Sequence, residues 1–246
     1  MAAAAAVGYP RRTADLRQRH HHVGGPAAHR RRAHLLHQLR ASATSDAGLR
    51  AETPAAGLAR QRRFVHRPFL LPGLRERFRQ LLAQASAKGY QIALDTGWPP
   101  EGWTPQVHEE VEGWLAHCDH LLVNELEAMS IAGNPDDCHD LELAVQRVAG
   151  LLKPGAHLIV KLGAAGALGH VDGRSIRYAT QETLEIFDTV GAGDSFNTGY
   201  LAARLNRASL IEALAAGCRT AAAILPRFPR KSIAAGELSH CLLPQS

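Results

Sequence analysis

The sequence predicts an α/β fold, with a mostly parallel β-sheet that is covered by helices on both faces and preceded by a disordered basic leader. After about residue 66, short apolar runs of strand length alternate with amphipathic helical patterns. Such alternation is typical of parallel sheets built from strand–helix units. Residues 1–66 contain 12 Arg, no Lys and 3 acidic residues, and they show no sustained apolar period. A segment of this kind buries too little apolar surface to fold.

We therefore place the domain boundary between residues 66 and 67. The whole chain has a formal net charge of +5, so the folded part is mildly acidic and the basic pI belongs to the leader. This excludes a nucleic-acid inference from charge alone. Arg without Lys indicates translation of an unselected reading frame or a wrong start, and a targeting peptide is the alternative.

The folded part opens with an amphipathic helix over residues 71–89, for which Gly89 is the expected C-cap. Thr104 and Pro105 are the expected N-cap and first residue of the next helix. The same reasoning gives strands over 90–95, 120–124, 157–163 and 184–188, a hairpin over 166–180, and helices over 104–118, 125–133, 140–152, 192–206 and 209–225.

Cysteine spacing and hydropathy point to a cytoplasmic protein without membrane segments. The four cysteines lie far apart and form no CxxC pair, which favours reduced thiols. No apolar run approaches the roughly 20 residues of a membrane span, and the first ten residues do not make a secretory signal.

The loop Gly191-Ala192-Gly193-Asp194 stands at the expected start of a helix. Glycines let the backbone approach a ligand, and the free amides of a first helical turn bind anions. An Asp in that turn is placed to accept a proton from a hydroxyl that attacks a bound phosphate. The alternative is a simple helix start, in which Asp194 offsets the helix dipole.

The stretch DTVGAGDSFNTGYLAARL resembles the second signature of the ribokinase-like (PfkB) family of carbohydrate kinases. The resemblance implies that Asp194 is the catalytic base and that Gly191, Ala192 and Gly193 form the anion hole. Asp188 then lies near a monovalent-cation loop, although it could instead cap the loop after its strand.

Two upstream stretches resemble further motifs of this family, in the family's order. NELE matches its NxxE motif, which implies that Asn124 and Glu127 organise magnesium indirectly; a helix cap is the alternative. KLGAAG matches its strand-end loop beside the nucleotide. This implies nucleotide binding by Lys161, Gly163 and Gly166, with a plain turn as the alternative, and Arg219 aligns with a position near adenine.

Other polar and aromatic residues are given no role in the chemistry. Asp95 ends an expected strand and resembles an Asp-rich family loop, but no direct role is expected for it. The three tryptophans are expected to pack, and the His20–His22 run is interpreted as incidental.

The resemblance covers residues 67–246 and omits the family's first half, which supplies most sugar contacts. The C-terminal LPRFPRK also lacks the glycine of the family's TRxGA stretch. The sequence therefore predicts an ATP- and magnesium-dependent sugar kinase, truncated and impaired, which self-associates through exposed edges. A catalytically inactive nucleotide-binding remnant is the alternative, and a nucleic-acid binder has no supporting motif.

Overall fold

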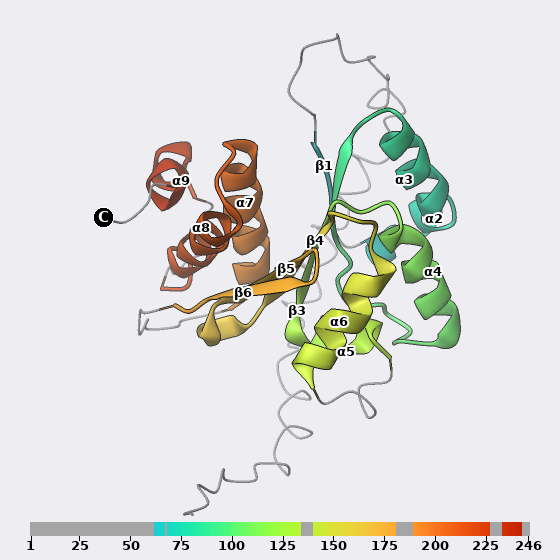
Figure 1. The fold of residues 1–246 in the computed structure, drawn as a ribbon. Helices are drawn as coiled ribbons and strands as arrows, with labels where there is room; N and C mark the ends of the chain where they lie inside the picture. Colours follow the sequence, from blue (N-terminus) through green and yellow to red (C-terminus); the bar gives the residue numbers. More distant parts are fainter. Residues whose placement is uncertain (1–61, 67, 134–139, 181–188, 227–232, 243–246) are drawn as a thin grey trace, which may run out of the picture. The chain divides into compact units, whose positions relative to one another are not determined.

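The computed structural model describes residues 62–66, 68–133, 140–180, 189–226 and 233–242. Its sheet runs in the order β1-β2-β3-β4-β5-β6 (Figure 1). Strands β1 to β4 pair in parallel, whereas β5 and β6 form an antiparallel hairpin beside β4. The fold is thus α/β, as expected, with a mixed sheet. The strands are β1 (Arg62–His66), β2 (Gln91–Asp95), β3 (His120–Asn124), β4 (His157–Lys161), β5 (Ala167–Val171) and β6 (Arg174–Tyr178).

Two groups of helices lie on opposite sides of the sheet (Figure 1). The first group is α2 (Pro72–Arg75), α3 (Phe78–Ala87), α4 (Pro105–Leu115), α5 (Glu125–Ile131) and α6 (Leu141–Leu151). The second is α7 (Ala192–Leu205), α8 (Leu210–Ala222) and α9 (Ala235–Leu242).

The central strands serve two hydrophobic cores because successive side chains point to opposite faces. In β3, Leu121 and Val123 pack with the first helix group, while Leu122 between them packs with α7 and α8. All three side chains are fully buried. Continuous apolar strands such as HLLVN are therefore explained by burial on both faces.

The chain forms two helices where the sequence predicts one over residues 71–89. Helix α2 ends at Arg75, and α3 begins at Phe78 after a turn at Arg77. Arg75 is held by ion pairs to Glu101 and Glu110, both 2.6 Å long, outside this segment. Lys88 is the C-cap of α3, and Gly89, the expected C-cap, follows it by one residue with a φ of +82°, a left-handed conformation that often ends a helix.

Residues 62–66 correct the expected extent of the leader. They form β1, which pairs with β2 from Arg62 opposite Gln91 to His66 opposite Asp95. A parallel strand has its partner far along the chain, so no local pattern reveals a strand of five residues that begins with two arginines. Helix α9 was also not expected from the sequence, which predicted only two closing helices.

Some sequence expectations fall outside the described residues, namely the rest of the leader with His20–His22 and the strand over 184–188. The remaining strands and helices form close to their expected bounds. Within the part of the chain that is described, no helix is long and apolar enough to cross a membrane.

Candidate active site

Three polar residues end neighbouring parallel strands and therefore lie along one edge of the sheet. They are Asp95 at the end of β2, Asn124 at the end of β3 and Lys161 at the end of β4. Asn124 and Lys161 are direct register partners. Ligands of open α/β sheets bind beyond this edge of the strands.

A buried polar network joins β2, β4 and α7 near this edge. The Lys161 ammonium donates to Asp95 Oδ2 at 2.8 Å, and the Asn197 amide donates to the same oxygen at 2.6 Å. Asn197 is fully buried, while the side chains of Lys161 and Asp95 are 14% and 6% exposed. Asp95 Oδ1 accepts from the amide of Gly97, which fixes the carboxylate plane.

The glycine-punctuated loop forms the start of α7, as the sequence predicts. Gly191 is the N-cap, with φ 80° and ψ 0°, a left-handed conformation that favours glycine. Asp194 lies in the first turn and is exposed. A helix of 14 residues carries a partial positive charge at this end, so its first turn attracts anions.

Lys161 lies beside this first turn. A Cβ built on Gly193 would stand 3.7 Å from Lys161 Nζ, with no other atom within 4 Å among those described. The structure therefore brings together Lys161 and the predicted anion hole, and it places a cation next to the amides of α7.

Asn124 and Glu127 form a reciprocal capping box at the start of α5. Asn124 Oδ1 accepts from the Glu127 amide at 2.8 Å, and Glu127 Oε2 accepts from the Asn124 amide at 2.9 Å. Their role as a helix cap, the alternative given by the sequence, is therefore shown. No group of three or more metal-ligating side chains occurs among the residues described. An amide and a carboxylate do suit Mg²⁺, which prefers oxygen ligands and keeps several waters.

The loop after β4 is a short 3-10 turn at Gly163–Ala165 that leads into β5. Gly163 and Gly166 have φ of 59° and 97°. A Cβ on Gly166 would collide with the carbonyl oxygen of Tyr178 in β6. Gly166 thus lets the loop close against the hairpin, as expected for a turn; its contact with a nucleotide stays a prediction.

The remaining predicted residues are Arg219, Asp188 and the tryptophans. Arg219 on α8 donates from Nε to the carbonyl of Cys241 in α9 at 2.9 Å. Asp188 lies outside the described residues. Trp114 packs in the core against Phe69 and Phe78, as expected. Trp98 packs edge-on against Trp103, with ring centroids 6.0 Å apart, and is 47% exposed.

Asp95 is the site residue that sequence reasoning passed over. Its partners Lys161 and Asn197 lie 66 and 102 positions away along the chain. The available signal was its place as an acidic residue that ends an apolar strand, parallel to a strand that ends in lysine.

Comparison with known proteins identifies one family. Residues 42–228 match the pfkB family of carbohydrate kinases. The 2-dehydro-3-deoxygluconokinase of Escherichia coli (strain K12) is 27% identical over 164 residues, which are 63% of this chain and 50% of that protein. The chain spans about half the length of the curated relatives that it matches first.

Two solved structures share the fold. Arabidopsis thaliana ribokinase in complex with ribose and ATP superposes with a TM-score of 0.58 and 21% identity, over 75% of this chain and 56% of that one. The aminoimidazole riboside kinase of Salmonella enterica, in complex with aminoimidazole riboside and an ATP analogue, gives a TM-score of 0.59 at 20% identity. That match covers 75% of this chain and 64% of the kinase.

Proposed function

Because the chain belongs to the pfkB family of carbohydrate kinases, we propose that it transfers the γ-phosphoryl group of ATP to a hydroxyl of a sugar. The observation that carries this proposal is the start of α7, where the first turn that bears Asp194 has its Gly193 beside the ammonium of Lys161. Phosphoryl transfer needs positioning and charge stabilisation more than covalent chemistry, and this arrangement supplies both.

Each group has a defined part in the proposed reaction. The exposed carboxylate of Asp194 accepts the proton of the attacking sugar hydroxyl. The amides of Gly191 and Gly193 and the dipole of α7 stabilise the negative charge on the phosphoryl oxygens. The Ala192 amide, which the resemblance also places in the anion hole, donates to the Thr189 carbonyl at 3.1 Å in this structure and would have to exchange that bond for a phosphoryl oxygen. Lys161 adds ammonium N–H donors beside Gly193 of the same turn, with its charge paired to Asp95.

Magnesium fits this site as a partner of the phosphates. Asn124 and Glu127 offer oxygen atoms at the same edge of the sheet and would hold the ion through water. When bound, Mg²⁺ neutralises charge on the phosphate oxygens. The proposed nucleotide contacts of Gly163, Gly166 and Arg219, and the proposed cation loop at Asp188, rest on the family resemblance alone.

The test is Asp194→Asn, assayed as ADP release with a panel of sugars and sugar acids. Loss of a general base lowers turnover by about 10²–10⁴-fold, while the amides still hold phosphate, so the affinity for ADP should change little. Glu142→Gln is the matched control, because Glu142 is likewise an exposed acid in the first turn of a helix, α6. A variant at Asp194 with normal turnover would contradict the proposed base.

A second candidate function is nucleotide binding without catalysis. It is favoured by the capping box of Asn124 and Glu127, because the helix start of α5 accounts for this motif without a metal ion. The same experiment separates the two functions, because a remnant binds ADP in both the parent chain and Asp194→Asn and releases none from ATP with any sugar.

A further inference from the structure

The Asp95–Lys161 ion pair is buried at a cost that fold stability alone does not explain. Desolvation of two charges offsets much of their attraction, so a buried pair adds little net stability. The side chain of Asp95 is 6% exposed and that of Lys161 is 14% exposed. A second buried group, the amide of Asn197, also donates a hydrogen bond to the same carboxylate oxygen. This concentration of polar groups lies at the ligand edge of the sheet.

The distances around Lys161 distinguish one anchor from two weaker contacts. An ammonium has three donors. Lys161 Nζ lies 2.8 Å from Asp95 Oδ2. The carbonyl oxygen of Leu122 and Oδ1 of Asn197 are 3.5 Å and 3.4 Å from the same nitrogen. Hydrogen bonds weaken at such lengths. Arriving phosphate oxygens can therefore replace the two long contacts while the short one is kept.

Asn197 couples this anchor to the anion hole. It lies four residues after Gly193 on α7, about one helical turn away, and it donates to Asp95 at 2.6 Å. The loop after β2, the end of β4 and the first turns of α7 are thus held by one carboxylate. Gly193 leaves the space between the ammonium and the first turn free of a side chain.

From this geometry we infer that Asp95 is a positioning residue for phosphoryl transfer, acting through Lys161. Asp95 holds the ammonium against the first turn of α7, so that two of its N–H groups meet the phosphate oxygens. The hydrogen bond from Asn197 fixes the position of the carboxylate relative to α7. The inference rests on the proposed function, which it deepens by assigning Lys161 to the phosphate beside Gly193.

A double-mutant cycle tests this chain of action. The variants are Lys161→Met, Asp95→Asn and both together, and the probe is the Mg²⁺ complex of the non-hydrolysable β,γ-imido analogue of ATP, titrated calorimetrically. Loss of a charged hydrogen-bond donor should weaken binding by about 10- to 100-fold in Lys161→Met. Asp95→Asn should weaken binding about tenfold in the parent chain, and by less than about twofold when Lys161 is already methionine.

The cycle stays informative if Asp95→Asn alone does not fold. That variant leaves Lys161 buried without its counter-charge, whereas the double variant removes both charges together. Comparison of Lys161→Met with the double variant then decides the question. Steady-state kinetics of folded variants should show a lower kcat and a higher KM for ATP with an unchanged KM for the sugar, whereas a purely structural defect would alter the KM of both substrates.

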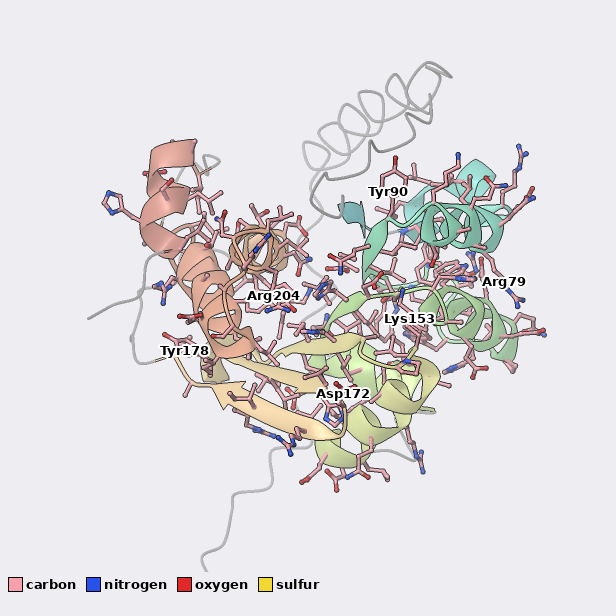
Figure 2. The ribbon with its side chains drawn as sticks, turned by 45° about the horizontal axis from the view of Figure 1, so that its top comes forward. Arg79, Tyr90, Lys153, Asp172, Tyr178 and Arg204 are labelled. Atoms are coloured by element: carbon pink, nitrogen blue, oxygen red, sulfur yellow. The ribbon has the colours of Figure 1, made fainter. Side chains whose placement is uncertain are left out.

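The Asp119–Lys153 pair is the matched control. It joins the same residue types at 2.9 Å, with side chains 21% and 30% exposed. Asp119 precedes β3 and Lys153 precedes β4, so the pair lies at the opposite ends of these strands from Lys161. Figure 2 shows Lys153 with the side chains around it. Asp119→Asn and Lys153→Met should leave analogue binding within about twofold of the parent.

Two results would overturn the inference while the proposed function stands. One is unchanged analogue binding in Lys161→Met. The other is an equal loss from Asp95→Asn in both backgrounds, which would mean that Asp95 acts without Lys161. A parent chain that binds no nucleotide at all would instead refute the proposed function, and the inference with it.

Discussion

At the scale of single residues, the two glycines that begin α7 serve different physical needs. Gly191 adopts a φ of 80°, which costs an L-amino acid roughly 1–2 kcal/mol. Gly193 is helical, and its hydrogen faces the Lys161 ammonium. The first position is needed for backbone conformation and the second for access to charge.

Alanine substitutions should separate these two needs. Gly191→Ala should lower the free energy of unfolding by roughly 1–2 kcal/mol. Gly193→Ala should leave it unchanged or raise it by up to about 1 kcal/mol, yet weaken binding of the ATP analogue, because the new methyl group lies 3.7 Å from Lys161 Nζ. Urea unfolding and calorimetry measure the two effects. Unchanged nucleotide affinity in Gly193→Ala would argue against phosphate at this turn.

His117 should make stability depend on pH. Burial, and then the charges of Arg79 and Lys153, lower the pKa of His117 below its ordinary value of 6.5; Figure 2 labels both cations. As pH falls below 6.5, the unfolded chain therefore binds a proton before the folded chain does, and this group reduces stability. When the pH is lowered from 7.5 to 5, the Tm of His117→Gln should fall by less than the Tm of the parent chain. The exposed His240→Gln serves as control.

The local part of the candidate site was predictable from sequence, and the long-range part was not. The loop ahead of Asp194 is visible because glycine spacing and a helix start are adjacent in the chain. Asp95 was passed over because its contacts are made by folding, with Asn197 102 positions away. Asn124 and Glu127 show the limit of a short motif, since their local pattern also describes the cap that they form.

At the scale of elements, close packing of α7 on α8 sets the position of the candidate site. A Cβ on Gly199 of α7 would collide with the Thr220 hydroxyl and would stand 2.7 Å from the Ala216 carbonyl, both on α8. The hydroxyl of Thr220 donates to that same carbonyl at 2.7 Å. The absence of a side chain at Gly199 therefore lets the helix that bears Asp194 lie close to its neighbour.

Gly199→Ala should destabilise the fold by roughly 1–3 kcal/mol through overpacking. Gly150, near the end of α6, is the matched control because a Cβ there would meet nothing within 4 Å. Gly150→Ala should stabilise the fold by about 0.4–1 kcal/mol, since it restricts the unfolded chain at a compatible position. Equal effects of the two substitutions on urea unfolding would show that α7 does not pack on α8 as described.

Elements with strong local signals were predicted well. Thr104 and Ser209 cap α4 and α8 where the sequence placed helix starts, because a cap depends on residues three positions apart. The sequence did not predict the break between α2 and α3. The partners of Arg75 at this break, Glu101 and Glu110, lie far along the chain, so no local pattern reveals them. β1 was missed because its partner strand begins at Gln91.

At the scale of the whole molecule, the described sheet has β1 and β6 as its outer strands. Exposed strand edges pair with other chains unless they are blunted by charge or covered. β6 carries Arg174 and Arg177, both exposed, which makes that edge unfavourable for pairing. Removal of β1 would leave β2, whose Ile92, Ala93 and Leu94 are fully buried, as the new outer strand.

Two truncated chains test how far the leader extends. The chain divides after Pro54, so we expect a protein that starts at residue 55 to match the full chain in Tm and nucleotide affinity. A protein that starts at residue 67 lacks β1 and should be less stable by at least about 2 kcal/mol, or roughly 4–8 °C in Tm. It should also self-associate in sedimentation velocity, because the edge of β2 is uncovered.

The family match begins at residue 42. A lower Tm for the chain that starts at residue 55 would therefore extend the folded domain into the expected leader. Equal behaviour of the two truncated chains would instead show that β1 adds nothing to the sheet.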